Sequence, residues 1–339
     1  MRYKLPEGYK IRPPTLQDVE ATTEMSNACM KHLTGIESYT ATGLDREWRT
    51  PGFDLETDAR LVVAPDGRVI AYYEVWDPGD PHTLIFLGGR VHPEHTGLGI
   101  GSFLLTWAEE RAHQSLPKAP PGARVALRAY ILSIDEPAQQ LFRDLEFELI
   151  RHAWRMVINL NGSPPSPEWP AGITLRTMVV GQDERAVFQA VRDSFKDHWG
   201  VIERPFEEEY TRWKFWVESD EDFDPSLFFL AIDGNEIAGV SLCQRKVSDD
   251  PEMGWVGTLG VRRPWRRRGL GSALLLHSFQ EFHRRGRCKV GLGVDAQSLT
   301  GATGLYLKAG MHPDPARQYS LYEKELRPGI DMSTLKVQD

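Results

Sequence analysis

The sequence has few cysteines, no long apolar run and no excess of positive charge, and each of these features excludes a class of protein. Its 339 residues contain three cysteines, Cys29, Cys243 and Cys288, which lie far apart and lack the spacing of a metal site. Such sparse cysteine favours free thiols in a reducing compartment, so we expect a cytoplasmic location. No stretch approaches the roughly 18 apolar residues of a membrane-spanning helix, and the first residues lack the apolar centre of a secretory signal.

The charge balance argues against a polyanion as the main partner. Lysine and arginine together number 40 and aspartate and glutamate 48, which gives a formal net charge of −8. Nucleic-acid-binding proteins are usually basic, so we expect neither nucleic acid nor a membrane among the partners. The length exceeds that of one typical domain, and two domains of ordinary size are therefore expected.

The order of predicted elements occurs twice along the chain. Strands alternate with helices up to residue 160, and a segment with four prolines, 161–171, then interrupts regular structure. After this linker the same order begins again. We therefore predict two α/β domains, 1–160 and 172–339, each with a mixed sheet covered by helices.

A glycine-bearing turn recurs in register in the two copies. Gly99 and Gly269 are 170 positions apart (269 − 99). Val91 and Val261, which end the strands before the two turns, have the same spacing. This agreement indicates a tandem duplication of one domain.

The turn of the second copy, residues 261–272, has the chemistry of an anion site. An apolar strand precedes it and an amphipathic helix follows it, so the free backbone amides of the first helical turn can point at an anion. Gly269 and Gly271 leave this backbone uncovered. Three neighbouring arginines can pair with phosphate oxygens. We therefore predict a pyrophosphate cradle, and the simpler alternative is a basic turn before an ordinary helix.

Together these features resemble the GNAT acetyltransferase superfamily, in two tandem copies that cover nearly the whole chain. The family's signature for the pyrophosphate of acetyl-coenzyme A is Gln or Arg, two residues, Gly, one residue, then Gly or Ala. The second copy matches it completely with Arg266, Gly269 and Gly271. The first copy keeps both glycines, but Thr96 stands where the signature has Gln or Arg. The resemblance implies an acyltransferase-like fold for each copy and acetyl-coenzyme A as the acyl donor.

The resemblance also implies cofactor-binding residues in both copies. In the family, a backbone N–H of the strand before the turn polarises the thioester carbonyl. The residues assigned in this way are Leu259, Val261, Arg266, Arg267, Arg268, Gly269, Leu270, Gly271 and Ser272 in the second copy, and Val91, Gly99, Gly101 and Ser102 in the first. We expect no metal, because His92 and His95 beside the first turn have no evident third ligand.

Catalytic roles follow from the same resemblance. The family's acid for the leaving thiolate is usually a tyrosine on the helix after the next strand, where this chain has Tyr306; an ordinary core tyrosine is the alternative. The first copy has Phe142 there, which has no proton to give, so we expect a degenerate N-terminal copy and chemistry in the C-terminal one. For the general base, a carboxylate near the strand leading into the turn, Glu252 is the nearest candidate. Its competitors are Asp249, Asp250 and Asp295.

The predicted function is acetyl-coenzyme A-dependent transfer of an acetyl group to the amine of a small polar molecule, by direct attack. Acidic and aromatic residues interleaved over 205–224 suit a cationic amine, although a helix with an aromatic core-facing stripe is the alternative. The tandem layout also resembles mycothiol synthase, which acetylates a cysteinyl amine. A non-catalytic acyl-coenzyme A sensor or scaffold is a further alternative. Either a monomer, with the two copies as a pseudo-dimer, or a homodimer fits the sequence.

Overall fold

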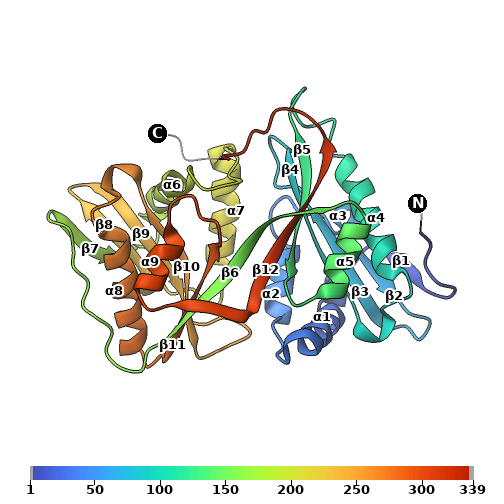
Figure 1. Cartoon of the computed structure of the whole chain (residues 1–339), viewed down its shortest axis with the longest axis horizontal. Helices are drawn as coiled ribbons and strands as arrows, with labels where there is room; N and C mark the ends of the chain where they lie inside the picture. Colours follow the sequence, from blue (N-terminus) through green and yellow to red (C-terminus); the bar gives the residue numbers. More distant parts are fainter. Residues whose placement is uncertain (1–2, 336–339) are drawn as a thin grey trace. The chain divides into compact units, whose positions relative to one another are not determined.

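The computed structural model describes residues 3–335, which form two compact units (Figure 1). Among these residues, unit 1 contains 3–151 together with 319–332, and unit 2 contains 152–318 and 333–335. This division differs from the two continuous domains that the sequence predicts, since each unit takes one strand from the other copy.

Unit 1 has a mixed sheet in which neighbouring strands run antiparallel except for one parallel pair, β4 with β5. Its strands, in sheet order, are β1 (Lys10–Arg12), β2 (Ala59–Val63), β3 (Val69–Trp76), β4 (Leu84–Val91), β5 (Val125–Leu132) and the second part of β12 (His312–Arg327). Its helices are η1 (Leu16–Asp18), α1 (Val19–Thr34), α2 (Ala41–Trp48), α3 (Leu55–Asp58), η2 (Pro93–His95), α4 (Ile100–His113) and α5 (Glu136–Asp144).

Unit 2 repeats this arrangement, with β10 and β11 as its parallel pair. Its strands, in sheet order, are β7 (Ile173–Thr177), β8 (Phe228–Asp233), β9 (Glu236–Gln244), β10 (Met253–Val261), β11 (Lys289–Asp295) and β6 (Glu148–Asn159). Its helices are α6 (Glu184–Phe195), α7 (Phe206–Glu218), η3 (Pro225–Leu227), η4 (Arg263–Trp265), α8 (Leu270–Arg284) and α9 (Ala302–Lys308).

The two copies exchange their last strands. β6 follows α5 of the first copy, but its residues 153–159 pair with β11 of unit 2. β12 follows α9 of the second copy, and its residues 319–327 pair with β5 of unit 1. Domain swapping between protomers exchanges an identical element in the same way. The predicted boundary after residue 160 therefore assigns β6 to the first domain, although this strand pairs in unit 2.

Helices cover both faces of the sheet in unit 2, and this explains its continuous apolar strands. In β8, Phe228 and Leu230 pack in a cluster with α6 and α7, whereas Phe229 and Ala231 pack in a second cluster with α8 and α9. Successive side chains of a strand point to opposite faces, so both sets are buried. The linker 161–171 contains no helix or strand, as the sequence predicts. No helix in residues 3–335 is long and apolar enough to cross a membrane.

Candidate active site

The turn between β10 and α8 leaves a row of backbone amides uncovered. Gly269 precedes the helix with a φ of +85°, and a Cβ built on it meets no atom within 4 Å. The first bond within the helix runs from the Ala273 N–H to the Gly269 carbonyl oxygen, 3.0 Å away, so the three amides before Ala273 have no acceptor in the helix. These amides and the helix dipole favour an anion at this end of α8.

The same backbone recurs in unit 1, although the sequence signature there is incomplete. Gly99 has a φ of +76° before α4, and Phe103 N–H donates to its carbonyl oxygen at 3.0 Å. Two positions earlier, Gly97 has a φ of +76° where unit 2 has Arg267 at +63°. Left-handed backbone is uncommon outside glycine, so its presence at both positions indicates a required turn geometry. Unit 1 therefore retains the shape of the cradle.

The three arginines of the turn in unit 2 do not play the same part. The Arg266 guanidinium donates to the carbonyl oxygens of Val261 and Ser194, each at 2.9 Å, and to Asp197 Oδ2 at 2.5 Å. It therefore braces the turn against α6 and the loop after it. Arg268 donates to a carbonyl oxygen of the linker. Within residues 3–335, only Arg267 of these three makes no hydrogen bond or ion pair, and its side chain is exposed.

Asp197 is the carboxylate that holds Arg266 in place. Its buried carboxylate contacts Arg263, with Nε to Oδ2 at 2.8 Å and a terminal nitrogen to Oδ1 at 2.7 Å, in addition to Arg266. Burial by itself raises the pKa of this carboxyl, but the hydrogen bonds from the two arginines outweigh it and lower the pKa. Thr96 in unit 1 has only a local bond, from its hydroxyl to the Pro93 carbonyl oxygen at 2.9 Å. The long-range brace is a feature of unit 2.

The strands next to the cradle separate toward their carboxyl ends. In unit 2, β10 and β11 pair only at residues 253–255 and 289–291. In unit 1, β4 and β5 pair only at 84–86 and 126–128. The two strands differ in one respect. β10 has a register shift against β9, at Gly257 between Val256 and Thr258, whereas β4 pairs regularly with β3 from Val91 to Phe86. A bulge increases the local twist of a strand and leaves one residue unpaired. The twist and backbone pairing of β10 beside the opening therefore differ from those of β4.

The pairing of β10 with β9 decides which backbone groups face this opening. The Arg262 N–H donates to the Ala238 carbonyl oxygen at 3.0 Å, so hydrogen-bonded and non-bonded positions alternate backward along β10 from there. Leu259 and Val261 are therefore non-bonded toward β9, and their N–H groups point toward the gap between β10 and β11. The structure thus brings both residues together with the cradle.

Tyr306 lies on α9 with only 7% of its surface exposed, in the core cluster that α8 also joins. Burial raises the pKa of its hydroxyl to about 12, so the phenol is protonated at neutral pH. Phe142 holds the equivalent place in unit 1. In each unit the N–H five residues later, at Phe147 and at Met311, donates to the carbonyl oxygen of this aromatic residue at 3.0 Å.

Glu252 is not brought to the cradle. It precedes β10, nine residues before Val261. At about 3.3 Å per residue this places it about 30 Å of strand from the cradle. Its exposed carboxylate lies 3.7 Å from the Arg287 guanidinium. Asp250 pairs with Lys289 at 2.9 Å, also at that end. Of the carboxylates that the sequence singles out, only Asp295 ends β11 on the side of the opening.

Asp249 is held by two arginines. Its carboxylate accepts from Arg155 at 2.8 and 3.1 Å and from Arg317 at 2.8 Å. Burial by itself raises the pKa of this carboxyl, and the two guanidinium groups outweigh it and lower the pKa. The group is therefore a fixed anion in an ion-pair cluster.

Three aromatic residues of α7, all partly buried, pack against α6 in unit 2. Phe206, Tyr210 and Trp213 all pack against Phe188 of α6, with ring centroids 5.3–5.7 Å apart. The Arg185 guanidinium lies 4.9 Å from the Tyr210 ring centroid. The stripe expected to recognise a cationic amine is thus already covered by an arginine of the chain itself, which favours the alternative of a core-facing stripe.

The comparison with known proteins decides the family. The model of the GNAT acetyltransferase family matches residues 20–147 and 188–311, one stretch in each unit. The chain belongs to the GNAT acetyltransferase family. The tandem α/β fold and the acyltransferase activity predicted from the sequence are thereby confirmed.

Relatives of this GNAT acetyltransferase are similar over most of its length. A mycothiol acetyltransferase from Thermobispora bispora is 31% identical over 258 residues, which cover 74% of this chain and 80% of the relative. A GCN5-related N-acetyltransferase from Sphaerobacter thermophilus is 39% identical, covers 97% of this chain and 99% of its own, and superposes with a TM-score of 0.77. A tandem GNAT protein of the clavulanic acid pathway, 16% identical and covering 95% of this chain and 99% of its own, shares the fold with a TM-score of 0.72.

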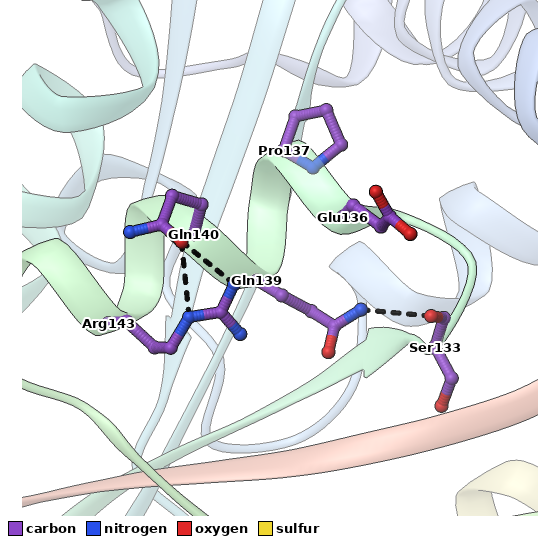
Figure 2. A pocket seen from close by; sticks show the side chains of 6 residues that line it. All are labelled: Ser133, Glu136, Pro137, Gln139, Gln140 and Arg143. Carbon is purple, nitrogen blue, oxygen red and sulfur yellow. Dashed lines mark hydrogen bonds between the residues drawn. The ribbon is translucent and has the colours of Figure 1, made fainter.

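Two further features of unit 1 lie outside the predicted site. A pocket of about 580 Å³ borders α5 and is lined by Ser133, Glu136, Pro137, Gln139, Gln140 and Arg143 (Figure 2). Arg143 and Gln139 both hydrogen-bond the Tyr322 hydroxyl, at 3.0 and 3.2 Å, so part of the lining is tied to the exchanged strand β12. None of the cofactor-binding residues predicted for unit 1 lines this pocket.

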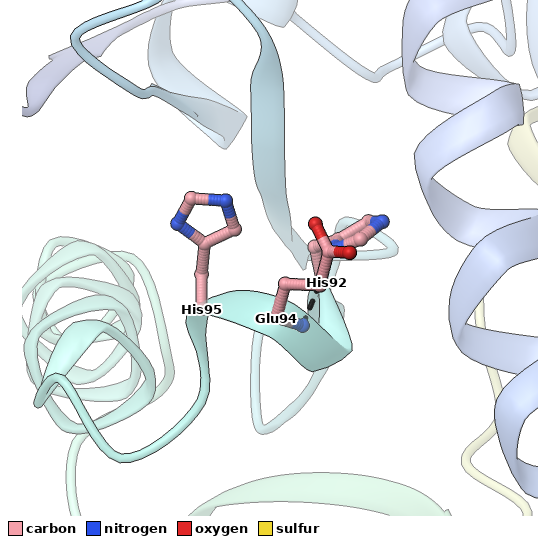
Figure 3. A group of neighbouring side chains, drawn as sticks. All are labelled: His92, Glu94 and His95. Atoms are coloured by element: carbon pink, nitrogen blue, oxygen red, sulfur yellow. Dashed lines mark hydrogen bonds and ion pairs between the residues drawn. The ribbon is translucent and has the colours of Figure 1, made fainter.

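The histidines beside the turn of unit 1 have a third neighbour that the sequence analysis missed. Ligand atoms of His92, Glu94 and His95 lie within 4.8 Å of one another (Figure 3). His92 Nδ1 accepts from the Glu94 N–H at 3.3 Å, and His95 Nδ1 hydrogen-bonds the hydroxyl of Tyr9, which precedes β1, at 2.9 Å. His92 thereby caps η2 before the cradle, and His95 ties η2 to the segment before β1.

Proposed function

We propose that this GNAT acetyltransferase moves an acetyl group from acetyl-coenzyme A to the amine of a small polar molecule, and that unit 2 carries the chemistry. The observation that supports unit 2 is the combination of a braced cradle with a buried, protonated phenol at Tyr306. Unit 1 has the cradle but carries Phe142 at the place of the phenol.

The residues of unit 2 are suited to bind the pyrophosphate and the pantetheine arm of coenzyme A. The amides of Leu270, Gly271 and Ser272 have no acceptor in α8, and a Cβ on Gly269 would meet no atom within 4 Å. The exposed Arg267 supplies a positive charge that no described carboxylate neutralises. The N–H groups of Leu259 and Val261 lie along the gap between β10 and β11. When bound there, the coenzyme supplies an activated acetyl thioester.

Tyr306 gives a proton to the departing sulfur in this proposal. A phenol with a pKa of about 12 holds its proton at neutral pH and is a suitable donor to a thiolate as negative charge develops. In unit 1, Val91, Gly99, Gly101 and Ser102 remain proposed cofactor-binding residues without a donor beside them. Cofactor held there is not turned over.

The acceptor belongs to the class of small amines. The mycothiol acetyltransferase relatives make a cysteinyl amine the first acceptor to test. The alternative of a non-catalytic sensor is not favoured, because these relatives are named as transferases. A cytoplasmic location suits the three free cysteines, Cys29, Cys243 and Cys288.

The test is release of free thiol from acetyl-coenzyme A in the presence of a panel of amines, with calorimetric binding of acetyl-coenzyme A measured alongside. Amine-dependent thiol release with formation of the N-acetylated product supports the proposal. Binding without release on any amine refutes catalysis and restores the sensor alternative.

A further inference from the structure

A histidine that the sequence analysis did not single out lies beside the cofactor turn of unit 2. His198 belongs to the loop between α6 and α7, and its ring packs against that of Phe195, with centroids 4.4 Å apart and the ring planes tilted by 52°. Phe195 in turn abuts the end of β10, because a Cβ built on Gly260 would lie 3.1 Å from its ring and 2.8 Å from Ser194 Cβ. The contacts from Gly260 through Phe195 place the imidazole near the carboxyl end of β10.

The loop that carries His198 is fixed on both sides. The residue before it, Asp197, is clamped by Arg263 and Arg266. The residues after it pair with the C-terminal segment, where Gly200 N–H donates to the Thr334 carbonyl oxygen at 2.8 Å and Thr334 N–H donates to the Val201 carbonyl oxygen at 2.9 Å. A preorganised loop is suited to hold a reacting group, since little conformational freedom is lost during the reaction.

The charges that act on this imidazole come from three elements. They are Arg266 in the cofactor turn, Asp197 in the same loop, and Asp295 at the carboxyl end of β11. Arg266 follows β10 and Asp295 ends β11, at the ends where these two strands are no longer paired. Burial and then the Arg266 charge lower the pKa of His198, and the two aspartates only partly oppose them. The ring is therefore neutral at pH 7, and its nitrogens make no hydrogen bond within residues 3–335.

We propose that His198 is the general base that takes a proton from the acceptor amine. This assignment rests on the proposed acetyl transfer in unit 2. As the nitrogen–carbon bond forms and the carbon–sulfur bond of the thioester breaks, the attacking amine gives one proton to the imidazole. Tyr306 gives one proton to the departing sulfur. Exchange with water then returns a proton to Tyr306 and removes one from His198, so the step balances.

The arrangement places the two proton-transfer groups on opposite faces of the sheet. The imidazole is on the face covered by α6 and α7, whereas Tyr306 is in the cluster with α8 and α9 on the other face. An amine can therefore approach from one face while the thiol leaves toward the other. The carboxylates predicted as bases do not offer this geometry, because Glu252 and Asp250 lie at the far end of β10.

The test compares His198→Gln with a matched variant of another half-buried histidine. His277 on α8 also has a pKa lowered by burial, but its ring packs against Phe229, at 4.6 Å between centroids, inside the core. We expect His198→Gln to lose about 10²- to 10⁴-fold in kcat, the usual contribution of a general base, while its Kd for acetyl-coenzyme A stays within about twofold of the wild type. His277→Gln, by contrast, is expected to keep most of its kcat.

Two readouts separate a base from a structural residue. The wild-type pH–rate profile falls on the acid side with a pKa below 6.5, the ordinary value for histidine, and His198→Gln loses that limb. A smaller variant, His198→Gly, regains activity when imidazole is added. In the free protein, NMR titration of the His198 ring, assigned with His198→Gln, gives a pKa below 6.5 without any activity measurement.

The outcomes distinguish this inference from the proposed function. Wild-type protein that transfers acetyl groups, together with a His198→Gln variant that keeps the turnover and the acid limb, overturns the assignment of the base alone. A measured pKa of His198 at or above 6.5 also overturns it. Wild-type protein that releases no thiol with any amine overturns the proposed function and the base with it.

Discussion

Replacement of Asp197 by Asn is expected to weaken cofactor binding in unit 2 without touching the cradle itself. The carboxylate is 5% exposed and holds two arginines, of which Arg263 is 46% exposed and Arg266 is 24% exposed. Removal of one partner from a fully buried ion pair costs about 3–5 kcal/mol. Because water reaches both guanidinium groups here, we expect a smaller loss of about 2 kcal/mol in the free energy of unfolding.

The effect on binding follows from the freed Arg266. Its guanidinium no longer ties the turn to the loop after α6, so part of the turn must be ordered when the ligand binds. A cost of about 1.4 kcal/mol corresponds to a tenfold rise in Kd. Titration calorimetry with acetyl-coenzyme A measures this rise, and the number of sites in the fit separates unit 2 from any site in unit 1.

Asp183→Asn is the matched control for this change. Asp183 accepts two hydrogen bonds from Arg176, at 2.5 and 2.9 Å. These bonds are the main reason that its pKa is also lowered. Asp183 precedes α6, at the opposite end of this helix from Ser194 and the turn. We expect Asp183→Asn to lower stability in urea unfolding and to leave the Kd unchanged. If Asp197→Asn binds acetyl-coenzyme A as tightly as the wild type does, the ion pair between Asp197 and Arg266 does not order the turn for cofactor binding.

The pH dependence of stability offers a second check on Asp197. Its pKa is lower in the folded protein than its ordinary value of 3.8, so its contribution is complete above that value. The contribution is lost as the pH falls from there through the lowered pKa of the folded state. In the Asn variant, acid unfolding below about pH 4 therefore loses part of its steepness.

Three further predictions concern the site itself. Tyr306→Phe is expected to lower kcat by about 10²-fold or more, because the proton donor is lost, whereas Phe142→Ala retains turnover; equal losses in thiol release contradict the placement of the chemistry in unit 2. Gly269→Ala strains a residue with a φ of +85° and is expected to raise the Kd for acetyl-coenzyme A about tenfold, while Gly234→Ala, with a φ of +59° in the β8–β9 hairpin, changes stability only. Glu252→Gln is expected to reduce kcat less than His198→Gln does, and the reverse order in the same assay returns the base to Glu252.

The exchange of β6 and β12 is the part of the fold that the sequence could not predict. The alternation of apolar residues identifies both segments as strands, since side-chain period is a local property. Which neighbour a strand joins depends on pairing between residues far apart in sequence. The two final strands follow equivalent helices and meet equivalent partners, β5 and β11, so the order of elements is the same with or without the exchange.

The proposed general base is the part of the site that the sequence could not predict. Proximity in sequence favours Glu252, a carboxylate just before β10. An extended strand instead carries that end about 30 Å from the cradle, because each residue adds about 3.3 Å. His198 stands alone in its stretch of sequence, and only the packing of Phe195 on Gly260 brings it to the opening.

The sequence by itself determined the duplication, the two glycine-bearing turns and the contrast between Tyr306 and Phe142, because these depend on local conformation and on residue type. The tertiary structure decided what the side chains do. It turned Arg266 inward onto Asp197, left Arg267 exposed, and packed three aromatic residues of α7 against Phe188 of α6. Such outcomes depend on which distant groups meet to satisfy a buried charge or cover an apolar surface, and no single stretch of sequence contains both partners.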